Sequence, residues 1–169
     1  FFNSLKSFGV NIEYMGGETA DVGDVVRTIA VNGTMTARVA KDKLITNEKI
    51  TAGNVIVGFS SYGKTTYENE YNSGLGSNGL TSARHDVLDK YYATQFPETF
   101  ESKLADEVVY IGKNKLKDTI KVNYKNNEIN TSIGKLLLSP TRTYAPFVKT
   151  LLENHFEKIN GMIHCSGGG

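Results

Sequence analysis

The sequence is short of cysteine, of net charge and of long apolar runs, and each shortage excludes a class of protein. Cys165 is the one cysteine among 169 residues, so no intrachain disulfide can form, which fits a reducing compartment. The net charge of +1 gives no basic excess for binding a polyanion. No apolar run reaches the length of a membrane span, and no secretory signal is visible. We therefore expect a cytoplasmic protein that binds neither nucleic acid nor membrane.

The two ends of the chain indicate that it is part of something larger. The chain opens on Phe1 and Phe2 without an initiating methionine, and it stops on three glycines at 167–169. Such glycine runs usually lie at the turn into a helix, and no helix follows here. We interpret the chain as an internal piece of a larger protein. Its 39% apolar and 22% charged residues are typical of a globular domain.

Hydrophobic periodicity predicts a mixture of helices and strands. Helical spacing is found at residues 1–8, where Gly9 follows as a cap, at 80–91 and most clearly at 144–152. Alternating or β-rich apolar residues predict strands at 10–14, 25–39, 55–59 and 159–163. Loops are predicted at 41–53 and 64–76. A strand pair is predicted from 108–111 and 120–124. Because no regular βαβ repeat appears, an α+β fold is expected.

A glycine pair that follows the first predicted strand is the first candidate site. Gly16 and Gly17 leave space for a ligand, while Glu18 and Asp21 offer the hard oxygen ligands that suit Mg²⁺. A tight turn with exposed acids explains the same residues.

Two further glycine runs have the composition of phosphate-binding loops. Ser77, Asn78 and Gly79 stand before a predicted helix, whose first amides attract phosphate. A plain N-cap by Ser or Asn is the other interpretation. The second run follows a predicted strand and comprises His164, Ser166, Gly167, Gly168 and Gly169, and a core or hydrogen-bonded role is the other interpretation of His164. Two such loops in one chain favour a phosphorylated ligand.

The residues before the strongest predicted helix add one cationic candidate. Pro140 would set the entry, Thr141 could cap the helix, and Arg142 could point its planar donor fork at an anion. An ordinary surface arginine is the alternative. His85 and His155 look like surface residues of helices. A loose lysine patch is interpreted as a solvated face: Lys113, Lys115, Lys117, Lys121 and Lys125.

Taken in order, four motifs resemble those of aminoimidazole ribonucleotide synthetase, also called phosphoribosylformylglycinamidine cyclo-ligase. They are Gly16-Gly17-Glu18-Thr19-Ala20, Ser77-Asn78-Gly79, Leu138-Ser139-Pro140-Thr141-Arg142-Thr143-Tyr144 and His164-Cys165-Ser166-Gly167-Gly168-Gly169. The resemblance spans nearly the whole chain and is weakest at 64–75 and 95–130. It implies a homodimer of two-domain α+β subunits. Residues 1–40 would be the tail of the β-rich N-terminal domain that binds ATP and dimerises, and 41–169 the first half of a C-terminal α+β domain.

The resemblance also implies a reaction of purine biosynthesis and a role for each motif. ATP would activate the formyl oxygen of formylglycinamidine ribonucleotide, and ring closure by the amidine nitrogen would expel phosphate. Glu18 would be the catalytic and Mg²⁺-binding residue, with Gly16, Gly17 and Thr19 beside it at the nucleotide. The substrate and its phosphate would be bound by Ser77, Asn78, Gly79, Arg142, His164, Ser166, Gly167, Gly168 and Gly169.

Departures from the family pattern leave two alternatives. Gly76 stands where the family usually has His, which is the best support for a non-catalytic paralogue that binds a phosphorylated metabolite. Another ATP-dependent member of the superfamily, such as formylglycinamidine ribonucleotide amidotransferase, also activates an oxygen with ATP. The family's upstream glycine- and aspartate-rich motifs for ATP and metal are not in this chain, so the chain by itself is expected to be inactive.

Overall fold

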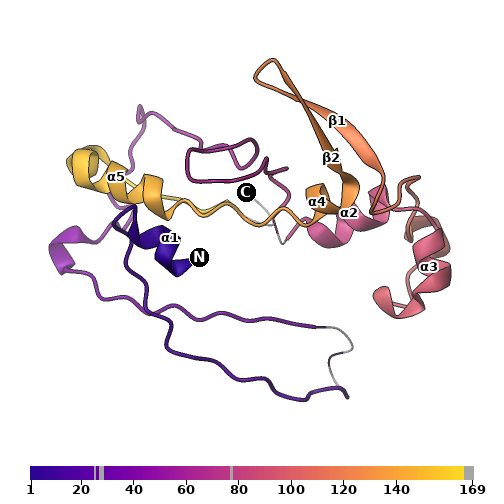
Figure 1. The fold of residues 1–169 in the computed structure, drawn as a ribbon. Coiled ribbons are helices and arrows are strands. Elements are labelled where there is room, and N and C mark those ends of the chain that lie inside the picture. Colours follow the sequence, from indigo (N-terminus) through magenta and orange to yellow (C-terminus); the bar gives the residue numbers. More distant parts are fainter. Residues whose placement is uncertain (25, 27–28, 77, 166–169) are drawn as a thin grey trace. The chain divides into compact units, whose positions relative to one another are not determined.

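The computed structural model describes residues 1–24, 26, 29–76 and 78–165, and these residues form two compact units (Figure 1). Unit 1 combines Phe1–Val57 with Thr143–Cys165, and the described part of unit 2 is Gly58–Arg142. Mixed helices and one two-stranded sheet make up the regular structure of the described residues. The expected domain boundary between residues 40 and 41 falls inside unit 1, and the domain division stays a prediction.

Unit 1 contains two of the predicted helices. Helix α1 (Phe2–Lys6) ends before Gly9, whose φ of 72° is in the left-handed region that favours glycine after a helix. Helix α5 (Ala145–His155) carries Pro146 in its first turn, where no intrahelical N–H is needed, and continues into the 3-10 turn η4 (Phe156–Lys158). A short 3-10 turn, η1 (Lys41–Lys43), opens the loop predicted at 41–53.

The strands predicted for residues 10–14, 55–59 and 159–163 do not form, and neither does 29–39, the continuously described part of the strand predicted at 25–39. The segment 29–39 runs as a drawn-out trace without strand pairing (Figure 1). Ile29 and Ile56 leave 95% and 96% of their surface exposed. A strand requires a neighbour that accepts and donates its backbone hydrogen bonds, and no described segment pairs with these residues. The alternating pattern alone was therefore not sufficient to make a strand.

Unit 2 contains the buried core, which is formed by Leu88, Val109, Tyr110, Ile133 and Leu137. The predicted helix at 80–91 divides into α2 (Leu80–Val87) and α3 (Tyr91–Gln95). Two 3-10 turns follow, η2 (Pro97–Thr99) and η3 (Asp106–Val108). Helix α4 (Ile133–Leu137) completes the unit, and the hydroxyl of its N-cap Ser132 accepts a hydrogen bond from the Lys135 N–H at 3.2 Å.

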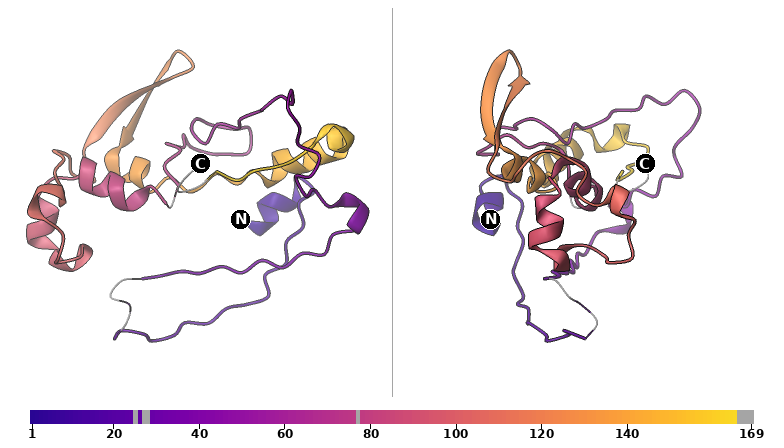
Figure 2. Two further views of the ribbon diagram at one scale, coloured as in Figure 1. Left: turned by 180° about the vertical axis from the view of Figure 1, so that it is seen from behind. Right: turned by 90° about the vertical axis from the view of Figure 1, so that its right-hand side faces the viewer.

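The sheet of unit 2 is an antiparallel hairpin that projects from α4 (Figures 1 and 2). Strand β1 (Thr119–Tyr124) pairs with β2 (Asn127–Ser132), with Tyr124 opposite Asn127 beside the turn. Lys125 and Asn126 form that turn with φ of 49° and 63°, the two positive values of a type I′ turn. The predicted pairing of 120–124 with 108–111 is wrong.

The segment 108–114 is bonded instead to the end of α2. The N–H groups of Ile111 and Gly112 donate to the carbonyls of His85 and Leu88 at 2.8 and 3.0 Å. A Cβ on Gly112 would lie 2.1 Å from the carbonyl of Val87, so only glycine allows this close approach. The last carbonyls of α2, which have no partner inside the helix, are satisfied in this way.

Candidate functional site

The Gly16–Thr19 motif lies in unit 1 on an exposed stretch of backbone. Gly16 has a φ of 115°, and a Cβ there would meet no atom within 4 Å. The side chain of Glu18 is exposed as well, so the motif has room for a ligand. Mg²⁺ is usually bound by one or two carboxylates together with substrate phosphates and water. A single accessible carboxylate therefore fits a nucleotide-bound Mg²⁺.

Several predicted ligands can be placed only in part. His164 is exposed and lies in unit 1, whereas Ser77, Ser166, Gly167, Gly168 and Gly169 lie outside the described residues. Among the residues that the structure describes, no three His, Cys, Asp or Glu side chains are grouped so as to hold a metal ion. An ion bound through Glu18 would thus need its other ligands from a bound nucleotide, from water or from residues outside the described ranges.

The start of α2 follows the second motif directly, and the phosphate-binding role of that motif stays a prediction. Gly79 occupies the N-cap position, and no side chain of a described residue caps the helix. Asn78 is therefore not the N-cap and is exposed next to the helix terminus, whereas the same interpretation of Ser77 lies outside the described residues. In general the first-turn amides of a helix, together with the positive end of its dipole, favour an anion at such a position.

The residues that lead to this helix form a fixed loop, which we call the anchored loop (residues 60–76). Its centre is closed by two backbone hydrogen bonds, from the Gly63 N–H to the Asn72 carbonyl at 2.9 Å and from the Asn72 N–H back to Gly63 at 2.8 Å. Gly63 has a φ of 101°, and a Cβ there would lie 2.6 Å from the hydroxyl of Tyr124 on the hairpin. The loop predicted at 64–76 is confirmed, and it is ordered by specific contacts.

The motif that precedes α5 binds the anchored loop along its backbone. The amide of Asn72 donates to the Pro140 carbonyl at 2.8 Å, and the Ser73 N–H donates to the hydroxyl of Ser139 at 3.1 Å. Next to them, a Cβ on Gly76 would lie 3.3 Å from Oγ1 of Thr141. Helix α5 has Tyr144 as its N-cap, so the expectation that Thr141 caps it is wrong. In this structure the motif therefore contacts the loop that leads to Asn78 and Gly79.

Arg142 and Glu68 form a buried ion pair at the base of the anchored loop. Their side chains are only 5% and 17% exposed, and Nε and Nη2 of Arg142 donate to the two carboxylate oxygens, both at 2.8 Å. Nη1 donates to the carbonyls of Ser60 and Tyr62 at 2.6 and 3.1 Å. Burial alone would raise the pKa of Glu68, but hydrogen bonds from Arg142 and from the Thr65 N–H, with the arginine charge, hold it below its ordinary value.

Glu68 and His85 were not identified as site or core residues from the sequence. Glu68 lies in a polar run, Tyr67-Glu68-Asn69-Glu70, and only its later contact with Arg142 distinguishes it from Glu70. His85 was interpreted as a surface residue, yet it is 7% exposed, whereas His155 is exposed as expected. The lysines at 113, 115, 117, 121 and 125 are all exposed, which confirms the solvated face.

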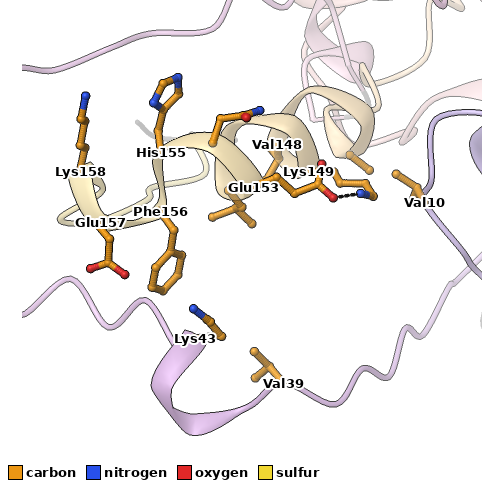
Figure 3. Close-up of a pocket in the computed structure, with 13 residues that line it drawn as sticks. Val10, Val39, Lys43, Val148, Lys149, Glu153, His155, Phe156, Glu157 and Lys158 are labelled. Carbon is orange, nitrogen blue, oxygen red and sulfur yellow. Dashed lines mark hydrogen bonds and ion pairs between the residues drawn. The ribbon is translucent and has the colours of Figure 1, made fainter.

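An open, mostly apolar groove of about 900 Å³ lies beside α5 in unit 1 (Figure 3). Val10 and Val39 face Val148 across it, and the ammonium of Lys43 lies 4.8 Å from the ring centre of Phe156. None of the described residues predicted for the site lines this groove. No helix in the described parts of the chain combines the length and apolar character that a bilayer crossing requires.

Comparison with known proteins identifies relatives along nearly the whole chain. No family model matches it. The phosphoribosylformylglycinamidine cyclo-ligase of Methanocaldococcus jannaschii is 31% identical over 158 residues, which are 94% of this chain and 34% of the relative. Those of Pyrococcus furiosus and Thermococcus kodakarensis are 30% and 31% identical over 168 residues, 99% of this chain and 36% of each relative. The chain spans about a third of the length of these relatives. The resemblance drawn from its motifs is confirmed.

Proposed function

We propose that this chain, a relative of the phosphoribosylformylglycinamidine cyclo-ligases, belongs to an enzyme that closes the imidazole ring of a purine precursor with ATP. The observation that carries the proposal is the 30–31% identity to those cyclo-ligases over nearly the whole chain. In this reaction the γ-phosphoryl group of ATP passes to the formyl oxygen of formylglycinamidine ribonucleotide and leaves ADP. The amidine nitrogen then attacks the activated carbon, loses a proton and expels phosphate.

The residues of this chain would act by binding and orienting the reactants. The open backbone at Gly16 would admit a nucleotide, and the exposed carboxylate of Glu18 would help to hold its Mg²⁺. Bound Mg²⁺ would supply charge neutralisation at the phosphates. Asn78 and the first amides of α2 after Gly79 would hold a phosphate of the substrate. Positioning and electrostatic stabilisation are the main contributions expected in phosphoryl transfer. We also propose a cytoplasmic homodimer for the intact protein.

A non-catalytic paralogue that binds a phosphorylated metabolite is the second candidate, and Gly76 favours it. Gly76 has a φ of 65°, and a side chain there would press against Thr141, so the loop is built for glycine where the family usually has His. Assays of the intact protein separate the candidates. Formation of aminoimidazole ribonucleotide supports the cyclo-ligase, whereas binding without turnover supports the paralogue. Glutamine-dependent amidation of formylglycinamide ribonucleotide would indicate the amidotransferase of the same superfamily.

Glu18→Gln in the intact protein tests the role of the nucleotide motif. We expect turnover to fall by about a hundredfold, a typical loss when one preorganised electrostatic group is removed. The thermal midpoint should stay close to the wild-type value, because the side chain is exposed. Glu13→Gln, an exposed carboxylate on the same stretch, is the matched control and should keep wild-type turnover. Wild-type turnover with unchanged ATP affinity in the Glu18 variant would refute the assignment.

A further inference from the structure

We infer that Glu68 and Arg142 are positioning residues, whose ion pair holds the anchored loop so that Asn78 and the start of α2 face an anionic ligand. The inference rests on the proposed function for the identity of that ligand. It gives Arg142 a role that differs from the direct substrate contact expected from the sequence.

All three guanidinium nitrogens of Arg142 donate to the anchored loop. Nε and Nη2 bind both oxygens of Glu68, and Nη1 binds the carbonyls of Ser60 and Tyr62. A guanidinium has five N–H donors in a rigid planar arrangement. Here one edge of the group binds the carboxylate, and Nη1 binds the two carbonyls. To grip a substrate phosphate with both sides of the guanidinium, the side chain would have to break these largely buried contacts.

The anchored loop ends close along the chain to Asn78 and the N-cap of α2, and its own hydrogen bonds hold its last residues. Asn72 joins the two sides of the loop, because its side-chain oxygen accepts the Gly74 N–H at 2.8 Å while its backbone pairs with Gly63. The hydroxyl of Ser73 donates to the Leu136 carbonyl at 2.8 Å and accepts the Leu75 N–H at 3.3 Å. These bonds fix the backbone as far as Leu75. Only a few residues separate this fixed backbone from Asn78 and the N-cap of α2.

The charge of the pair explains why both members are needed. Removing one partner of a buried ion pair leaves an uncompensated charge, which is far more destabilising than removing both. An unpaired Glu68 would pull water into the base of the loop, and it would add a negative charge to the element that leads to an anion site. An unpaired Arg142 would leave its cation buried against two carbonyls. Loss of either partner should therefore release the loop.

Three variants of the full-length protein test this inference: Glu68→Gln, Arg142→Met and the double variant. We would measure kcat and KM for formylglycinamidine ribonucleotide, together with hydrogen exchange of the amides at 72–76. Each single variant should raise KM about tenfold, as expected when one molecule in ten keeps the competent loop, and should lose amide protection. The double variant should lose no more than Arg142→Met. Glu70→Gln is the matched control, because Glu70 lies on the same loop in an exposed ion pair with Lys135.

The outcomes separate this inference from its rivals. If Arg142 binds substrate directly, Glu68→Gln frees its guanidinium and KM stays constant or falls, which overturns the positioning role. Unchanged amide protection in Glu68→Gln overturns it as well, and this variant serves if Arg142→Met does not fold. If the wild-type protein turns over none of the substrates, the proposed function fails. Hydrogen exchange of the same variants then still decides whether the pair holds the loop.

Discussion

At the scale of single residues, His85 shows how burial changes the role of a polar side chain. Its Nδ1 accepts the N–H of Tyr110 at 3.2 Å, so in the neutral ring the proton is on Nε2. That Nε2 is buried and has no hydrogen-bond partner among the described residues. Burial foremost, then the nearby charge of Arg84, lowers the pKa of His85, although Asp86 acts in the opposite direction. The neutral form is therefore the one that the fold accepts.

This assignment predicts how stability depends on pH. Because the folded pKa lies below the ordinary value of 6.5, the unfolded chain binds the proton more readily. The contribution of neutral His85 to the free energy of unfolding is complete above pH 6.5, and it is lost as the pH falls toward the folded pKa. Between pH 7.5 and 5.5 the midpoint of thermal unfolding should fall more steeply for the wild type than for His85→Gln. His155→Gln, at an exposed position, should keep the wild-type slope. Equal slopes for His85→Gln and wild type would contradict the assignment.

The sequence contained a signal for His85 that composition alone does not show. His85, Leu88 and Tyr92 are spaced i, i+3 and i+7, and Leu88 and Tyr92 belong to or pack against the core. For Glu68 no comparable signal exists, because its partner Arg142 is 74 positions away in the chain. A side chain whose role is set by such a distant contact cannot be recognised from local spacing.

At the scale of elements, the longest helix was predictable, whereas among the predicted strands only 120–124 forms, as β1. The helices carry their hydrogen bonds within themselves, so the apolar spacing at 144–152 was enough to locate α5. A strand depends on its neighbour, and β2 is a polar segment that no apolar pattern marks. The apolar run 108–111 was assigned to a strand because it is β-rich. In the structure Val109 and Tyr110 are buried in the core instead.

The turn of the hairpin allows a stabilising substitution. Asn126 has a φ of 63°, a conformation that glycine adopts without steric cost, and glycine is the preferred second residue of a type I′ turn. We expect Asn126→Gly to stabilise the hairpin by about 0.5 kcal/mol. Urea unfolding monitored on the hairpin amides measures the change. Asn127→Gly is the control and should destabilise, because Asn127 pairs with Tyr124 in the ladder. A loss of stability in Asn126→Gly would contradict the turn geometry.

At the scale of the whole molecule, the most evident feature is apolar surface on segments without secondary structure. Ile29, Val31, Val55 and Ile56 are almost fully exposed. Large apolar surfaces that face solvent usually mark positions where further protein binds. The strand pattern of these segments was recognisable from the sequence. Because no described segment pairs with them, the pattern could predict their apolar character but not their structure.

The chain expressed by itself should therefore associate. We expect the 169-residue chain to bind a hydrophobic dye and to scatter light at micromolar concentration. The double variant Ile29→Lys with Ile56→Lys should reduce both signals several-fold, because each change places a charge on an exposed apolar segment. Thr34→Lys, on the same exposed stretch as Ile29, is the control for added charge alone. Equal dye binding by the double variant and Thr34→Lys would show that these segments are not responsible.

The distance along the chain between Glu68 and Arg142 has a consequence for biosynthesis. A ribosome delivers the loop well before it delivers the arginine, because 74 positions separate the two. While translation continues, the nascent loop lacks its counter-ion, its carbonyl partners and the Ser139 hydroxyl. Folding of this part of the protein must wait until the arginine has left the ribosome. Synthesis that stalls between the two residues would therefore leave a partly unfolded, protease-sensitive intermediate.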